Sequence, residues 1–157
     1  MASVNPKTIM ESYVTAVRAM PALVTLVGGT TGNITALHAV INNATDILQA
    51  VNKLETPRAM FIFEGARPVQ ASGGREVLSN SFRLILKLKL QSDYMDFWTE
   101  FINGTPTTGS TKLTDLKVTN CLDFMRDYSI ARQSIPVTET TSVDFFSIGF
   151  AVRQSGC

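Results

Sequence analysis

The feature that most constrains this chain is the strict alternation of residue types at residues 82–91. One set of positions is apolar throughout and the other is mostly polar, with Phe82, Leu84, Leu86, Leu88 and Leu90 alternating with Arg83, Ile85, Lys87, Lys89 and Gln91. A period of two is typical of a β-strand with one buried face, and here it outweighs leucine's preference for helices. The chain is therefore expected to build a sheet around this strand.

A second strand and a protruding arm are predicted just before the alternating stretch. Residues 59–63 are apolar on both faces and aromatic, which suits an interior strand. The segment that follows, residues 65–79, contains Pro68, Gly73 and Gly74 and is too long for a tight hairpin turn. We therefore expect residues 65–79 to form an arm that protrudes between the two strands.

Helical spacing of apolar residues marks other segments. Asn5 followed by Pro6 predicts a helix start, and Pro21 ends or kinks that helix. A second helix is expected around residues 37–54 and a third at residues 93–103. The stripes are Ile9, Met10, Tyr13, Val14 and Val17, then Leu37, Val40, Ile41, Ala44, Ile47, Leu48, Val51 and Leu54, then Tyr94, Phe97, Trp98, Phe101 and Ile102.

The last third of the chain predicts two more strands. A polar loop rich in threonine and glycine, residues 104–114, leads to strand-like stretches at about residues 116–130 and 141–153. In the second stretch, one face carries only the small side chains of Ser147, Gly149 and Ala151. Small residues on a strand allow another element to pack closely against it.

Together these elements predict one α+β domain spanning residues 1–157. Its sheet is expected to be four-stranded and mainly antiparallel, with N-terminal helices covering one face and one short helix between the two hairpins.

Composition limits the classes of function. With 45% hydrophobic and 17% charged residues, the chain can bury roughly 70% of its unfolded surface in one domain. A formal net charge of +1 argues against a protein that grips phosphate backbones. Cys121 and Cys157 suggest no disulfide framework or metal cluster, and neither a signal peptide nor a membrane span is apparent. We expect synthesis in a reducing cytosol.

No catalytic, cofactor-binding or metal site is predicted, so we expect a protein that is not an enzyme. The only histidine, His38, falls within the second helical stripe without a visible catalytic partner. Cys121 is expected to be a core residue, and the glycines at residues 28–32 to form a turn between helices. The carboxylates of Asp93, Asp96 and Glu100 are interpreted as one solvated helix face.

Three basic residues, Arg83, Lys87 and Lys89, share the outward face of the alternating strand. One interpretation is a solvated sheet face, which antiparallel sheets commonly have. The other is that a neighbouring subunit supplies acidic partners to these residues. The sequence leaves both open.

This layout resembles the tail terminator proteins of long-tailed bacteriophages, also called neck or tail-completion proteins. The likeness covers nearly the whole chain and is carried by a pattern of elements: the N-terminal helices, the strand entry at residues 57–63, the arm, the strand at residues 81–89, the aromatic helix at residues 93–103 and the closing strand at residues 145–153.

The resemblance implies a virion protein without an active site, assembled in the host bacterial cytoplasm. Members of this family form a six-membered ring on the finished tail tube, stop its polymerisation and present a surface to the DNA-filled head. The implied partners are other copies of the chain, the tail tube protein and a head-completion (connector) protein. DNA is expected to pass through the ring without sequence-specific binding, and no membrane is involved.

Two alternatives remain at this stage. Other ring proteins of the neck or tail, such as a head-completion or tube protein, share related α+β layouts. A small-ligand or carbohydrate-binding module would use the aromatic residues of the sheet to line a pocket.

The expected assembly interface combines the arm with the basic strand face. Long insertions between strong strands are usually functional, and this one offers both apolar and basic side chains. The predicted interface residues are Arg67, Pro68, Val69, Arg75, Arg83, Lys87 and Lys89.

Overall fold

A computed structural model describes residues 5–41, 43–70, 72–88, 94–103, 122–136 and 138–154. Its longer elements are α1 (Pro6–Arg18), α2 (Pro21–Leu26), β1 (Ile34–Val40), α3 (Ala44–Lys53), β2 (Arg58–Gln70), β3 (Glu76–Lys87), α4 (Met95–Asn103), β4 (Leu122–Pro136) and β5 (Ser142–Gln154). Short 3-10 turns occur at Thr31–Asn33 and Ser72–Gly74. The α+β class is as predicted. Lys89, Asp93, the predicted loop at residues 104–114 and both cysteines lie outside the described residues.

The sheet has five strands in the order β1-β2-β3-β5-β4, so the prediction of four strands was one short. The added strand is β1, which runs parallel to β2, with Ile34 opposite Ala59. Its residues were assigned to the start of a helix, because Leu37, Val40 and Ile41 also fit a helical period. The helix itself, α3, begins only at Ala44, where the Asn43 side chain accepts a hydrogen bond from the Asp46 N–H at 2.8 Å. The glycine turn therefore joins a helix to a strand.

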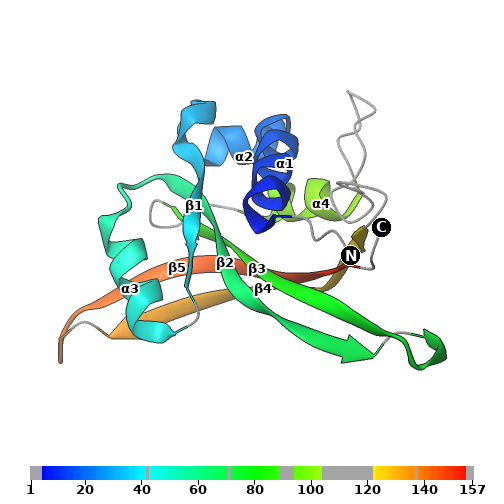
Figure 1. The fold of residues 1–157 in the computed structure, drawn as a ribbon. Coiled ribbons are helices and arrows are strands. Elements are labelled where there is room, and N and C mark those ends of the chain that lie inside the picture. The colour runs from blue at the N-terminus through cyan, green and yellow to red at the C-terminus, as the bar shows by residue number, and fades with distance from the viewer. Residues whose placement is uncertain are drawn as a thin grey trace.

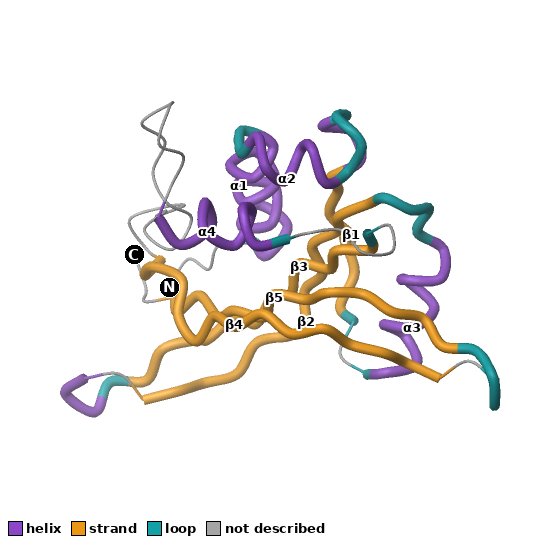
Figure 2. The backbone as a smooth tube through the Cα atoms, turned by 180° about the vertical axis from the view of Figure 1, so that it is seen from behind, coloured by secondary structure: helices purple, strands orange, loops and turns teal. Residues whose placement is uncertain are grey.

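Helices cover both faces of the sheet, not one face as predicted (Figure 1). Helices α1, α2 and α4 lie over one face, here called face A, whereas α3 lies on the opposite side of the sheet in both Figure 1 and Figure 2. That opposite side is called face B. Its buried residues form a smaller cluster with α3, comprising Ile41, Val51, Met60, Ile62, Ile85 and Phe145.

The core on face A contains a group of aromatic side chains in contact with one another. The ring of Tyr13 on α1 lies 6.2 Å from that of Phe61 and 5.2 Å from that of Phe150, and Phe82 stacks on Phe150 at 5.7 Å. All four side chains are buried. The helix that supplies Tyr13 begins as predicted, since the Asn5 side chain accepts a hydrogen bond from the Lys7 N–H and Pro6 occupies the first turn.

Helix α4 joins this core and also supports α2. Phe97 and Phe101 are fully buried, which confirms the predicted apolar face. Glu100 is half-buried, and its carboxylate accepts a hydrogen bond from the Ala22 N–H at 3.2 Å. A carboxylate at the first turn of a helix satisfies a free backbone donor, so the interpretation of Glu100 as part of a solvated face was wrong.

The predicted arm is a regular β-hairpin. Strands β2 and β3 stay paired through residues 65–79 as far as Gln70 opposite Glu76, and together they extend away from the helices (Figure 1). Gly73 and Gly74, whose φ angles are +82° and +76°, adopt the left-handed conformation that lets the chain reverse direction there. Pro68 is tolerated in a strand because β1 pairs with β2 only as far as Phe63, which leaves residue 68 on a sheet edge.

We predict that Tyr13→Phe leaves the free energy of unfolding unchanged or raises it by about 1–3 kcal/mol at pH 8. The Tyr13 hydroxyl is buried without a hydrogen-bond partner among the described residues, so its removal relieves a desolvation cost. Urea unfolding measures the difference, and a clear loss of stability would mean that the hydroxyl has a partner.

The same variant tests the titration of Tyr13 in alkali. Burial raises the pKa of the Tyr13 phenol, so above about pH 10 only the unfolded state releases this proton. The wild type should therefore lose about 1.4 kcal/mol of stability per pH unit above pH 10 from this group. Tyr13→Phe removes that component, so the stability gap between variant and wild type should widen between pH 9 and about pH 11. A constant gap would contradict the burial of the phenol.

Candidate assembly surface

The predicted interface residues of the hairpin divide between the two faces of the sheet. Arg67 lies opposite Ser79 and Val69 opposite Val77, which puts both on face B, whereas Pro68 lies opposite Leu78 on face A. Arg75 is exposed at the turn. These four residues therefore do not form one surface.

A β-bulge decides which hairpin residues share face B. Phe63 pairs with Phe82 and Gly65 with Ser81, so Glu64 is an extra residue in β2. One extra residue reverses the side-chain alternation beyond it. Without the bulge, Pro68 would lie on face B together with Ile62. Because of the bulge, Arg67 lies on face B instead and Pro68 lies on face A.

Arg83 is held by its own chain. Its Nε donates to Glu64 Oε1 at 3.0 Å and one terminal nitrogen donates to Ser147 Oγ at 2.9 Å. The guanidinium lies flat over Gly149, where an added Cβ would meet it at 3.8–3.9 Å. The side chains of Arg83 and Glu64 are only 24% and 19% exposed. The acidic partner of Arg83 thus comes from its own chain. Arg83 is neither fully solvated nor dependent on a neighbouring subunit, which were the two interpretations of the sequence.

Lys87 also has an internal role. Its Nζ donates hydrogen bonds of 2.8 Å to the carbonyl oxygens of Val51 and Leu54 at the end of α3. Carbonyls at a helix C-terminus lack partners in the helix and favour a cation. Burial lowers the pKa of the Lys87 ammonium from its ordinary value. Lys87 therefore fastens α3 to face B.

None of the helices that the structure describes covers face B at the end nearer the β2–β3 hairpin, and a shallow polar depression of about 310 Å³ lies there. The floor is made of small residues, including Ser79, Ser81, Ser129, Gly149 and Ala151. Glu64, Arg67, Arg83 and Asp127 supply the charged groups of its lining. We call this feature the basic depression, because arginines gather around it.

One arginine from each of four neighbouring strands lies on this part of face B. Arg67 and Arg153 both lie opposite Ser79 and so flank it in one row across β2, β3 and β5. Arg126 of β4 lies opposite Ala151, which lines the depression, and Arg83 lies opposite Gly149. Four arginines therefore share this end of face B with the carboxylates of Glu64 and Asp127.

The rest of the described surface offers little chemistry. His38 lies on strand β1, not in a helix as predicted, and its Nε2 contacts Glu11 Oε1 with both side chains largely exposed. Among the described residues, no group of three or more His, Cys, Asp or Glu could hold a metal ion. That the chain is not an enzyme stays a prediction.

A second pocket, of about 370 Å³, lies between α3 and strands β1 and β2. Aliphatic residues such as Leu37, Val40 and Met60 line most of it, with Asp46 and Lys53 among its polar members. The sheet aromatics Phe61 and Phe82 are buried in the core. None of the residues that line this second pocket is aromatic, whereas Phe82 and Phe150 contribute to the lining of the polar depression. The binding-module alternative stays a prediction.

No known protein family and no curated protein matches this chain in sequence. Of the helices that the structure describes, none has the length and apolar character needed to cross a membrane.

Sequence reasoning found part of this surface. It identified Arg67, Arg83 and the small residues Ser147, Gly149 and Ala151. It missed Glu64, Ser79 and Arg153, since their proximity depends on the pairing of β2, β3 and β5 and on the bulge. No local signal in the sequence specifies that register.

We predict that Glu64→Gln lowers the free energy of unfolding by about 1–3 kcal/mol, because it removes the charged partner of a largely buried arginine. The matched control is Glu55→Gln, which breaks a 2.9 Å pair with Arg58 at a carboxylate that is 81% exposed. That change should cost at most about 0.5 kcal/mol. Chemical unfolding of both variants gives the comparison, and equal effects would contradict the assigned role of Glu64.

Proposed function

We propose that this chain is a structural subunit that assembles with copies of itself into a closed ring, of the kind that tail terminator proteins form on a phage tail. The observation that carries the proposal is the open sheet: β1 and β4 are its edge strands, and its hairpins extend in opposite directions (Figure 1). An open edge and a bare sheet face are surfaces that another chain can complete.

The two edges of the sheet differ from each other, and its hairpins extend in opposite directions, so contacts between subunits are expected to be head-to-tail. A contact between two different surfaces repeats from subunit to subunit, and it gives a ring if the rotation closes or a filament if it does not. The edge strands β1 and β4 differ in length and in the direction of pairing, since β1 is parallel to its neighbour and β4 antiparallel. They are therefore unlike surfaces, as a head-to-tail contact requires.

In the proposed role, a ring of six copies closes the head-proximal end of the tail tube and presents a docking surface to the head. Its partners are the tail tube protein and a head-completion protein, and its location is the virion. The near-neutral net charge of +1 supports DNA passage without tight binding. A head-completion or tube protein built from the same kind of subunit is the neighbouring candidate.

We predict that the purified protein forms particles of ring size in light scattering and annular particles, expected to be six-membered, in negative-stain images. A chain that remains a monomer at all concentrations, both alone and with tail tubes, would contradict the proposal.

Adding the protein to a polymerising tail tube protein distinguishes the candidates. A terminator should shorten the tubes as its concentration rises and should be found at one tube end. A tube protein would form tubes by itself, and a head-completion protein would leave tube length unchanged.

A further inference from the structure

We infer that the tip of the β4–β5 hairpin of one subunit binds in the basic depression of the next, with the Glu139 carboxylate as its anchor. This inference rests on the proposed function, because it names the contact that would join the subunits of the ring.

The receiving side is an arginine pair with a hydroxyl between its members. Arg67 and Arg153 flank Ser79 in one row, and strands about 4.8 Å apart put their backbones roughly 10 Å from each other. No described side chain pairs with either arginine, whereas Arg83 is already bound to Glu64. A carboxylate entering between Arg67 and Arg153 would accept charge-assisted hydrogen bonds from both and a further bond from Ser79.

The entering side is a preorganised turn. The Thr138 N–H donates to the Thr141 carbonyl at 3.2 Å, and the hydroxyls of these two threonines lie 2.6 Å apart. The Thr138 hydroxyl also accepts hydrogen bonds from the N–H groups of Thr140 and Thr141. Little conformational entropy is therefore lost when the tip binds.

Glu139 is the acidic group that this turn presents. It is exposed and has no partner in the described part of the chain. The other carboxylate near the tip, Asp144, lies 3.6 Å from Arg132 of the same hairpin. Glu139 is thus available to a cation from another chain.

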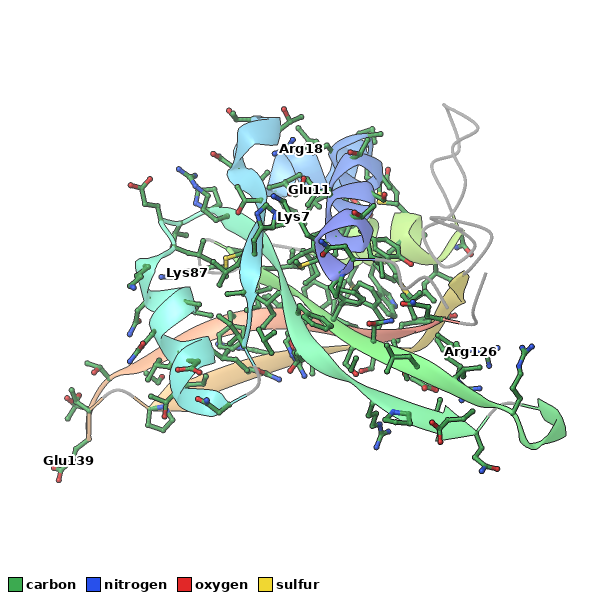
Figure 3. All side chains as sticks on the ribbon, viewed as in Figure 1. Lys7, Glu11, Arg18, Lys87, Arg126 and Glu139 are labelled. Atoms are coloured by element: carbon green, nitrogen blue, oxygen red, sulfur yellow. The ribbon has the colours of Figure 1, made fainter. Side chains whose placement is uncertain are left out.

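The two surfaces lie at opposite ends of the molecule. Figure 3 shows Glu139 at the far tip of one end and Arg126, which lies beside the basic depression, towards the other. A subunit cannot place its own tip in its own depression, so the complementary charges can meet only between copies. Such a contact is head-to-tail, which is the type that generates rings.

The lining of the depression favours a protein segment over a polyanion such as DNA. Arg67 and Arg83 are balanced in its lining by Glu64 and Asp127, so the depression offers no excess of positive charge to a chain of many phosphates. A hairpin tip instead brings a single carboxylate, that of Glu139, on a turn whose own polar groups are largely hydrogen-bonded to each other. The floor of serine, glycine and alanine residues also lets another backbone approach closely.

Charge exchange tests the inference. Arg67→Glu and Glu139→Arg should each weaken assembly about 10-fold or more, because each sets like charges against each other. The double variant should recover most of that loss. The fold is checked by thermal melting, and Arg153→Glu replaces Arg67→Glu if the latter fails to fold. Arg75→Glu, at an exposed turn outside the depression, is the control and should assemble as the wild type does.

Assembly is measured by sedimentation over a range of protein and salt concentrations. If the wild type forms rings but both single reversals assemble equally well, the inference is overturned and the proposed function stands. If the double variant is no better than the single ones, the pairing of these two sites is likewise overturned. A wild type that never assembles overturns both the contact and the ring.

Discussion

Aromatic packing between α1 and the sheet is the constraint on which the rest of the structure depends. Tyr13 meets Phe61 and Phe150 from above, and Phe82 stacks on Phe150 from the strand between theirs. The rings of Phe61, Phe82 and Phe150 come from the consecutive strands β2, β3 and β5, and all three lie on face A. A slip of one residue in any strand would turn its ring to face B and expose it. The core on face A therefore fixes the rows in which the residues of face B meet.

Face B inherits this register and divides into two parts with different chemistry. Beneath α3 it is apolar, with Ile62, Ile85 and Phe145 buried. Beyond α3 it becomes a floor of small residues crossed by arginines, of which Arg83 is satisfied internally. The bulge at Glu64 contributes twice, since it supplies the carboxylate for Arg83 and turns Arg67 towards the same face. The bulge at Glu64 therefore lies at the boundary between the apolar half of face B, which packs against α3, and the half that contains the basic depression.

The sequence predicted those features that depend on the residue pattern within a single helix or strand. The alternation of β3, the stripes of α1 and α4, and the small residues of β5 were all visible because each follows from the period of one element. It failed where spacing is ambiguous, as at Leu37 and Val40, whose positions fit both a helix and the short edge strand in which they lie. It also predicted the arm at residues 65–79 without recognising that β2 and β3 stay paired along it, because glycine and proline usually end strands and here mark a bulge, an edge and a turn.

The central claim, that the bare half of face B receives the hairpin tip of a second copy, is tested most directly by engineered disulfides. Cys121 and Cys157 would first be replaced by serine, and cysteines then introduced at Ser129, which lines the depression, and Thr140, near the tip. A control pairs Thr140→Cys with Thr8→Cys, an exposed position on α1 over face A. Under mild oxidation the account predicts a ladder of covalent oligomers ending at the ring size for the first pair and monomers for the control. Monomers for both pairs, in a protein that still forms rings, would contradict it.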